Sequence, residues 1–295
     1  MARKFLLLAL MVVGFIPAIQ ACEVCGCASQ ANPGILNGYR NNHVGLSYSS
    51  VHFQRGDHPG NSLVDEFISF GLTGSYQVKP WFRVSGFLPY RINTRTKNGL
   101  SDSRNGLGDL TITPIFKLSE KQFNNWTIFA EAGLGLVIPT GKFDPKIHDA
   151  NLPENFNPGF GSWGISPLVN LNIQYKKTGI QSNVNLLLYN STKDGYQFGN
   201  QAFFQTFLYH QFSFKNISLS PYLGILLEQV KQDEYENGNL VKDTGGKGQY
   251  FQTGLNFQIN QFLAGFNYVI PVSGSYSGMA NTAQPRFQTQ LFFNF

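Results

Sequence analysis

Arg286-Phe-Gln-Thr-Gln-Leu-Phe-Phe-Asn-Phe295 alternates apolar and polar residues and ends on an aromatic residue. Successive side chains of a strand point to opposite faces, so the stretch predicts a strand with one apolar and one polar side. The apolar side carries Phe287, Thr289, Leu291, Phe293 and Phe295. A terminal Phe on a final strand resembles the C-terminal signal of bacterial outer-membrane proteins.

The same alternation recurs from about residue 43 onward in runs of roughly ten residues that are separated by turn residues, which is the pattern of a transmembrane β-barrel. A soluble antiparallel sandwich also alternates, so alternation alone leaves both folds open. Twelve runs can be counted, and an even number is typical of single-chain bacterial barrels. They cover residues 43–54, 65–78, 81–92, 107–118, 125–138, 163–176, 179–191, 201–214, 216–230, 249–259, 261–272 and 286–295.

The lengths of the connections favour the barrel. Short links follow every second run, at residues 79–80, 119–124, 177–178, 215 and 260. Long links fall between them, at residues 55–64, 93–106, 139–162, 192–200, 231–248 and 273–285. Short periplasmic turns and long extracellular loops are typical of outer-membrane barrels. We therefore predict an all-β fold: a transmembrane antiparallel β-barrel of about 12 strands, with both chain ends in the periplasm.

The first 21 residues are typical of a cleaved signal peptide. Arg3 and Lys4 precede an apolar stretch at residues 5–16, and small residues at 18–21 form a cleavage site. The apolar stretch is too short to span a bilayer as a helix. We predict a signal peptide at 1–21, a Cys-rich periplasmic segment at 22–42 and a barrel at 43–295, in the outer membrane of a Gram-negative bacterium.

Charge and composition narrow the partners. Loss of Arg3 and Lys4 leaves 20 Lys and Arg of the original 22 against 17 Asp and Glu, a net charge of about +3. So small an excess gives no reason to expect nucleic acid as a partner. The 27 Phe and 13 Tyr suit the aromatic girdles of a barrel, which predicts lipid contact instead.

The polar faces of the predicted strands carry mainly amides and hydroxyls, with few charges. We expect Arg83, Arg91 and Glu131 to form a constriction in the lumen, because opposite charges near one another would narrow the path. Further charged residues on these faces include Asp109, Lys117, Glu228 and Arg286. Such a lining either fills a narrow barrel or passes a small, largely neutral solute.

Three prolines lie inside predicted strands on the lipid-facing register: Pro114, Pro167 and Pro221. A proline has no N–H to donate to the ladder. We therefore expect a broken rung at each, which would form either a kink or a local opening toward lipid.

Three segments in order resemble a known family: Gly106-Leu-Gly-Asp-Leu-Thr-Ile-Thr-Pro-Ile-Phe-Lys117, Ala130-Glu-Ala-Gly-Leu-Gly-Leu-Val-Ile-Pro-Thr-Gly-Lys142 and Gly161-Ser-Trp-Gly-Ile-Ser-Pro167. Their order and spacing resemble the outer-membrane family named for the MetA pathway of phenol degradation, which is similar to hydrocarbon-uptake channels. The resemblance covers about residues 80–190. It implies passage of small, often hydrophobic or aromatic molecules, and it supplies no catalytic residues.

All three cysteines follow the predicted cleavage site: Cys22, Cys25 and Cys27. Three close thiolates suit Cu(I) or Zn(II). Export also permits a disulfide, from Cys22 to either of the others, and Cys22 could instead carry a lipid. These alternatives stay open.

The function that these observations favour is an outer-membrane channel for small, weakly polar or aromatic solutes. The alternative is a barrel that uses its cysteine cluster to bind metal or to dock a periplasmic partner. A barrel enzyme is disfavoured, because strand alternation places His210 and Ser213 on opposite faces and a hydrolase needs its nucleophile and base within reach of each other.

Overall fold

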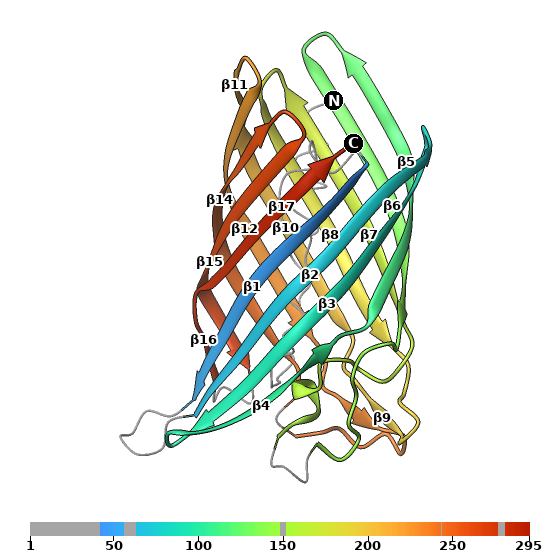
Figure 1. Cartoon of the computed structure of the whole chain (residues 1–295), viewed down its shortest axis with the longest axis vertical. Coiled ribbons are helices and arrows are strands. Elements are labelled where there is room, and N and C mark those ends of the chain that lie inside the picture. The colour runs from blue at the N-terminus through green and yellow to red at the C-terminus, as the bar shows by residue number, and fades with distance from the viewer. Residues whose placement is uncertain (1–41, 56–62, 148–151, 243, 277–280) are drawn as a thin grey trace, which may run out of the picture.

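The computed structural model describes residues 42–55, 63–147, 152–242, 244–276 and 281–295, which form a closed antiparallel β-barrel (Figure 1). The main sheet has 15 strand segments. Three wall strands are interrupted, so that β4 with β5, β10 with β11 and β16 with β17 each make one strand, and the wall has twelve strands as predicted. The predicted signal peptide and Cys-rich segment lie outside the described residues.

The segments of the wall are β1 (His43–Arg55), β2 (Leu63–Lys79), β3 (Phe82–Lys97), β4 (Leu100–Leu107), β5 (Leu110–Phe123), β6 (Trp126–Ile138), β7 (Gly164–Tyr175), β8 (Thr178–Tyr189), β10 (Gln201–His210), β11 (Phe212–Phe214), β12 (Ile217–Val230), β14 (Gly246–Ile259), β15 (Phe262–Tyr276), β16 (Asn281–Ala283) and β17 (Arg286–Asn294). A separate small sheet pairs β9 (Tyr196–Gln197) with β13 (Glu234–Tyr235).

The barrel closes where the last strand meets the first. β17 pairs antiparallel with β1, from His43 opposite Asn294 to Ser50 opposite Phe287, and β1 pairs with β2 on its other side. The alternating stretch at the end of the sequence is therefore the closing strand of the wall. Its exposed members include Leu291 at 52% and Phe287 at 43%.

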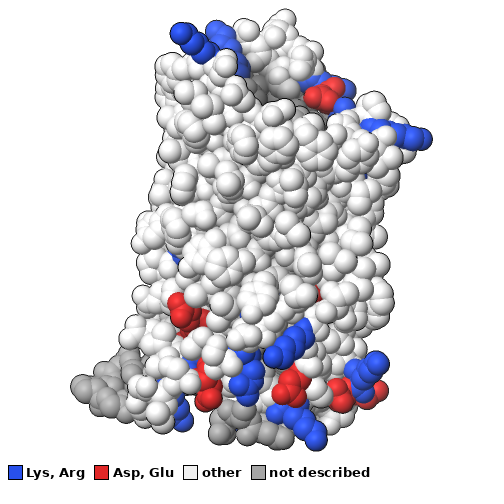
Figure 2. Space-filling view, in the orientation of Figure 1, with Lys and Arg blue, Asp and Glu red and all other residues white. Residues whose placement is uncertain are grey.

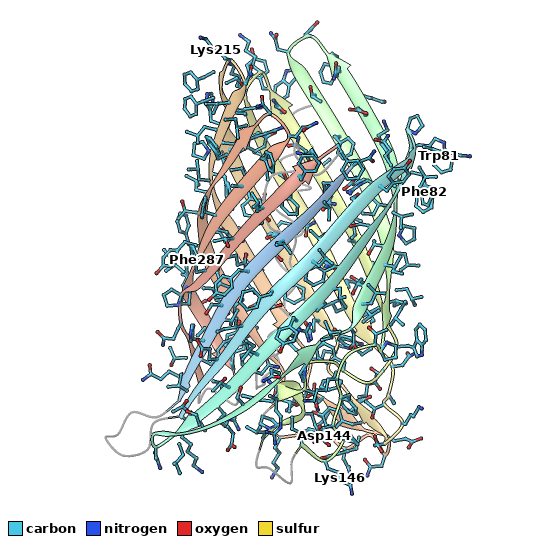
Figure 3. All side chains as sticks on the ribbon, in the orientation of Figure 1. Trp81, Phe82, Asp144, Lys146, Lys215 and Phe287 are labelled. Carbon is cyan, nitrogen blue, oxygen red and sulfur yellow. The ribbon has the colours of Figure 1, made fainter. Side chains whose placement is uncertain are left out.

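Short turns gather at one end of the barrel and long loops at the other. The short turns contain Asn124, Lys176, Lys215 and Asn260, each with a φ near +50°, which suits a tight reversal. Figure 3 shows Lys215 at this end and Asp144 with Lys146 at the other. The long loops hold the β9–β13 sheet and a 3-10 helix, Glu154–Phe156. No helix in the described part of the chain is long and apolar enough to cross a membrane.

Three predicted connections differ from the structure. In residues 273–285, expected as a long link, β15 runs on to Tyr276 and β16 covers Asn281–Ala283. Residues 93–106, expected as a long loop, belong mostly to a hairpin of β3 and β4 that turns at Asn98-Gly99, where φ is 52° and 83°. An Asn-Gly pair with positive φ at both positions is the favoured two-residue hairpin turn. Residues 119–124, expected as a link, lie largely in β5, which runs on to Phe123.

The two faces of the wall have opposite chemistry, as the alternation predicted. Leu134 and Val169 are 52% and 47% exposed on the outside, whereas Glu131 and Asn170 are 2% and 1% exposed on the inside. Figure 2 shows a broad belt nearly free of charged side chains between two charged ends. Such a belt is the surface that lipid contacts.

Each of the three prolines breaks a rung on one side only. Pairing of β5 with β6 skips Pro114, pairing of β7 with β8 skips Pro167, and β12 pairs with β10 and β11 on either side of Pro221. Each proline keeps a partner on its other side, such as Val84 opposite Pro114. The missing N–H explains the one-sided interruption, and the predicted broken rungs are confirmed.

Candidate functional site

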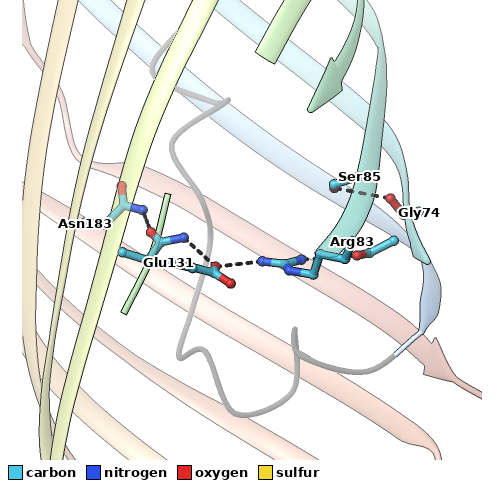
Figure 4. Close-up of polar contacts among 7 residues, drawn as sticks. Gly74, Arg83, Ser85, Glu131 and Asn183 are labelled. Carbon is cyan, nitrogen blue, oxygen red and sulfur yellow. Dashed lines mark hydrogen bonds and ion pairs between the residues drawn. The ribbon is translucent and has the colours of Figure 1, made fainter. Parts of the chain in front are cut away.

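An ion pair lies on the inner face of the barrel wall, near the end of the barrel that carries the short turns. Arg83 Nη2 lies 2.7 Å from Glu131 Oε1, and the two side chains are 13% and 3% exposed. Arg83 Nη1 also donates to Ser75 Oγ at 3.1 Å. Arg83 stands on β3 and Glu131 on β6, so the pair reaches over the intervening strand β5 (Figure 4).

Carboxamides continue this contact along the wall. Asn170 Nδ2 on β7 donates to Glu131 Oε1 at 2.8 Å, and Asn183 on β8 donates to Asn170 Oδ1. Gln205 on β10 donates to Asn183 Oδ1 at 3.5 Å. The neighbouring strands therefore place one polar row at one level of the lumen, and the row holds the carboxylate of Glu131 in place.

A cavity of about 210 Å³ lies beside the ion pair. Its lining combines the paired charges with apolar side chains that include Phe82, Ile115 and Phe129. Lys117, a further cation of the lining, is itself paired with Glu120 Oε2 at 2.7 Å. Lys79 also lines the cavity, and its Nζ lies 5.5 Å from the centre of the Trp81 ring, so the cavity offers apolar contact beside two ion pairs and one further cation.

Arg91 does not join this cluster. Its Nη1 donates to the Pro158 carbonyl oxygen at 2.9 Å, and its guanidinium lies 5.1 Å from the centre of the Phe160 ring. The structure therefore brings together two of the three residues expected at a constriction and places the third against the loop of residues 139–163. Whether Arg83 and Glu131 limit passage stays a prediction.

Asp109 fastens that loop at both ends. Its Oδ1 accepts the backbone N–H of Gly141 at 2.9 Å, and its Oδ2 accepts the backbone N–H of Phe160 at 2.7 Å. The three segments that carry the family resemblance meet here, because the first contains Asp109, the second contains Gly141 and the third begins directly after Phe160.

Small residues let the backbones cross at this point. A β-carbon added at Gly141 would lie 2.7 Å from the carbonyl carbon of Gly108 and 2.8 Å from the α-carbon of Gly159. One added at Gly108 would lie 2.9 Å from the Pro158 oxygen. These contacts are shorter than a side chain tolerates, so the junction requires glycine for close approach rather than for φ.

The loop fills the extracellular mouth with apolar side chains. Ile147, Leu152 and Phe156 are at most 2% exposed and pack into one cluster with Phe53 and Phe67 of the wall. A second cluster joins loop residues to the wall: Val137, Phe160, Leu187, Tyr189, Tyr196, Phe198 and Phe203. The two clusters therefore pack the described parts of the extracellular loops against the wall, with Asp109 as a polar contact beneath them.

A second ion pair joins two strands on the inner face of the wall. Arg286 on β17 donates through Nη1 and Nη2 to both oxygens of Glu228 on β12, at 2.9 and 2.8 Å, and Arg286 is 1% exposed. Tyr276 donates to Glu228 Oε2 at 3.0 Å, and Tyr250 contacts both Arg286 and Tyr276. The sequence placed both Glu228 and Arg286 on polar strand faces but gave no sign that they pair.

The predicted metal ligands Cys22, Cys25 and Cys27 lie outside the described residues. Within the described ranges, no group of three or more His, Cys, Asp or Glu side chains could hold a metal ion. Metal binding by the cluster therefore stays a prediction from sequence.

The closed twelve-stranded wall and its uncharged belt define an outer-membrane β-barrel. A family model described as the MetA-pathway of phenol degradation matches residues 46–287, and the chain belongs to this family. The match extends well beyond the segment where the resemblance was found. No curated protein matches the chain in sequence.

Two solved structures share the fold. An outer membrane channel from Pseudomonas putida F1 superposes with a TM-score of 0.61 at 13% identity, over 92% of this chain and 100% of that one. The β-domain of a Bordetella autotransporter gives a TM-score of 0.51 at 10% identity, over 86% of this chain and 100% of that one.

Proposed function

We propose that the protein is an outer-membrane channel that passes small, weakly polar or aromatic solutes. The observation that carries this proposal is the lumen lining, in which amides and hydroxyls predominate and the charges of Arg83 and Glu131 neutralise each other. A lining of this kind neither repels nor traps a neutral solute. The family membership and the channel fold support the same reading.

The cavity beside the ion pair supports the aromatic part of the proposal. Phe82 stacks on Phe116 with ring centres 5.0 Å apart, and Trp81 stacks on the same ring at 6.1 Å. These three rings lie on the outer face, because Phe82 pairs with Phe116, which is 43% exposed, and adjoins the inward Arg83, so they belong to an aromatic girdle. Inside the lumen an aromatic solute would meet Phe129 and Ile115 of the cavity lining, and contact between aromatic rings is favourable.

The packing of residues 139–147 and 152–163 against the wall at the extracellular end suggests that solute entry depends on this loop. Lumen polarity would set which solutes pass, and the loop would set when they pass. The two functions rest on different residues and can be tested separately.

The test is conductance and solute flux through purified, refolded protein. In planar bilayers we expect small, discrete current steps, and in proteoliposomes we expect swelling with small neutral solutes. Folding is checked by heat-modifiable mobility on gels. A folded barrel that conducts no ions and admits no solute would overturn the proposal.

A second candidate function is a barrel whose N-terminal cysteine cluster binds Cu(I) or Zn(II) or docks a periplasmic partner. The observation that favours it is three thiols within six residues, since thiolates select soft ions. This function and the channel are compatible. We also propose that the protein is not an enzyme, because His210 contacts only Thr178 Oγ1, at 2.7 Å, and the Phe212 ring among the described residues, and no carboxylate orients it as a catalytic base.

A further inference from the structure

A track of carboxamides runs along the inner face of β14, β15 and β17. Arg286 lies beside Gln288 on the same face of β17, and its charge is compensated by Glu228. We define the track by its residues: Gln252, Asn256, Asn267, Gln288, Gln290 and Asn294. All six are less than 9% exposed, and all stand on the inward register of their strands. The amide track was not expected from sequence as a unit, because its members come from three strands.

The track begins at a pocket of about 400 Å³ at the periplasmic rim. Six of the lining side chains are carboxamides, and the seventh residue is Phe295. Asn294 belongs to both the pocket and the track. Neither polar atom of its side chain has a hydrogen-bond partner among the described residues, although the residue is only 5% exposed.

A glycine leaves space for the side chains at the middle of the amide track. Gly265 lies in register between Asn256 and Gln290. A β-carbon at Gly265 would stand 2.3 Å from Gln290 Nε2 and 2.8 Å from Asn256 Oδ1, so both amides lean over this position. Both side-chain atoms of Asn256 and the Oε1 of Gln290 lack partners in the described part of the chain.

In the part of the amide track farthest from the periplasmic rim, some side chains hydrogen-bond to one another. Asn267 Nδ2 donates to Gln252 Oε1 at 3.2 Å and to Gln288 Oε1 at 2.9 Å. Asn267 Oδ1 and Gln252 Nε2 then lack partners in the residues described. The track as a whole therefore presents both unused donors and unused acceptors.

An apolar edge runs beside the amides. Phe292 lies between Gln290 and Asn294 on the same inward face and packs on Leu263. Its ring also meets the His43 ring edge-on at 5.1 Å. A ring-shaped solute could contact this edge with its apolar face while its polar groups reach the amides.

The unused atoms identify the kind of solute. A buried polar group without a partner costs about 1–3 kcal/mol, so these atoms must bind either water or a solute that replaces the water. A carboxamide offers both a donor and an acceptor, and a hydroxyl group offers both in return. A carboxylate would satisfy only the donors, an ammonium only the acceptors, and a hydrocarbon neither.

We propose that the amide track is the solute-binding face of the channel and selects neutral ring-shaped solutes that carry adjacent hydroxyl groups. The proposal rests on the channel function proposed above and names its substrate class. Such solutes can be sugars or aromatic diols, because both present adjacent hydroxyls on the edge of a ring.

The experiment measures block of the ion current by added solute in planar bilayers. The probes are two matched pairs: xylose with tetrahydropyran, which is its ring without hydroxyls, and catechol with benzene. We expect xylose, catechol or both to block at lower concentration than their hydroxyl-free partners. Which of the two blocks identifies the source of the hydroxyls.

Variants then locate the site. Asn256→Leu and Gln290→Leu should each raise the half-blocking concentration about fivefold, the effect of one net hydrogen bond. Two controls should leave it unchanged: Gln249→Leu, exposed on the outer face of β14, and Asn185→Leu, on β8 away from the track. Heat-modifiable mobility shows that each variant is folded.

The outcomes are distinct. Three results would overturn the inference and leave the channel function standing: a conducting channel that neither xylose nor catechol blocks, block by the hydroxyl-free partner equal to that by the hydroxylated probe in each pair that blocks, or block that is unchanged in both track variants. Absence of any conductance in the folded wild type overturns the channel function and the inference with it.

Discussion

Asp109 Oδ2 accepts the backbone N–H of Phe160 at 2.7 Å, across 51 positions of the sequence. The same carboxylate accepts Gly141 N–H through its other oxygen, so one side chain of the wall holds both ends of the loop at residues 139–163. Hydrogen bonds to a charged acceptor are stronger than those between neutral groups. One charged side chain therefore fastens this loop at its base.

Asp109→Asn should loosen the packing of this loop. An amide NH₂ group placed against one of the two N–H donors forfeits that bond, which costs roughly 1.5–3 kcal/mol for a charged acceptor. We expect larger or more frequent current steps and faster cleavage of residues 139–163 by an external protease. Asp102→Asn, at an exposed position of β4, is the matched control. Unchanged current and cleavage in the Asp109 variant would show that the packing of the loop does not depend on this carboxylate.

Arg83 and Glu131 should set ion selectivity in opposite directions. Glu131→Gln leaves the Arg83 cation uncompensated in the lumen, so the reversal potential in a salt gradient should shift toward anions. Arg83→Gln leaves the carboxylate and should shift it toward cations. The double variant should return close to wild type, which serves as the control. Shifts of the same sign in both single variants would mean that the pair does not face the conducting path.

The Glu228–Arg286 pair should matter for stability more than for selectivity. Both side chains are at most 3% exposed, so Glu228→Gln leaves a buried guanidinium without its counter-charge. Loss of one partner of a buried pair costs about 3–5 kcal/mol. We expect a clear drop in the urea midpoint of barrel unfolding for this variant.

The double variant Glu228→Gln with Arg286→Met is the informative comparison. It removes both charges, and buried pairs can be replaced by apolar groups at little cost. Its midpoint should therefore lie closer to wild type than that of Glu228→Gln alone. A double variant that is less stable than the single one would indicate that the pair itself, rather than the orphaned charge, governs stability.

The wall could be predicted from sequence because its rule is local. A side chain's face depends only on strand parity, so Leu134 and Glu131 were assigned to the correct faces without knowledge of their neighbours. The hairpin turn at Asn98-Gly99 was missed although its signal was present, because the polar residues around it were taken as a loop. Residues 93–106 show that a strand can continue beyond the membrane without an apolar face.

The contacts of the candidate site could not be predicted from strand parity alone. Glu228 and Arg286 stand on strands separated by β14 and β15, so their meeting depends on the stagger between strands. Arg91 was placed on the correct face, but its height in the lumen put it against a loop instead of beside Glu131. Asp109 faces inward as predicted, while its role required a loop that folds back, which no strand pattern encodes.

The cysteine cluster gives a prediction from sequence. We expect the reduced mature protein to bind Cu(I) or Zn(II) through Cys22, Cys25 and Cys27, because the thiolate is the metal ligand. Cys25→Ser should abolish binding and leave heat-modifiable mobility unchanged. Metal titration of both proteins is the measurement. Equal binding in the two would leave a disulfide or lipid attachment as the role of the cluster.

Asp233 should make the extracellular loops sensitive to pH. It lies just after β12, 3% exposed, where Oδ1 accepts Gly199 N–H at 2.6 Å and Oδ2 accepts the Tyr196 hydroxyl. Burial raises the pKa of Asp233 from 3.8 to about 6, although both hydrogen bonds act to lower it. The folded loops therefore hold this proton more tightly than the unfolded chain does.

The direction of the pH effect follows from that raised pKa. The contribution of Asp233 to loop stability is complete below about pH 4 and is lost as the pH rises through about 6, by on the order of 3 kcal/mol. Amide hydrogen exchange of β9 and β13, corrected for its intrinsic pH dependence, should show greater protection at pH 4.5 than at pH 7.5. Asp233→Asn cannot ionise, so its protection should differ little between the two conditions. Protection that rises with pH in the wild type, or a variant that keeps the wild-type slope, would assign the pH response to another group.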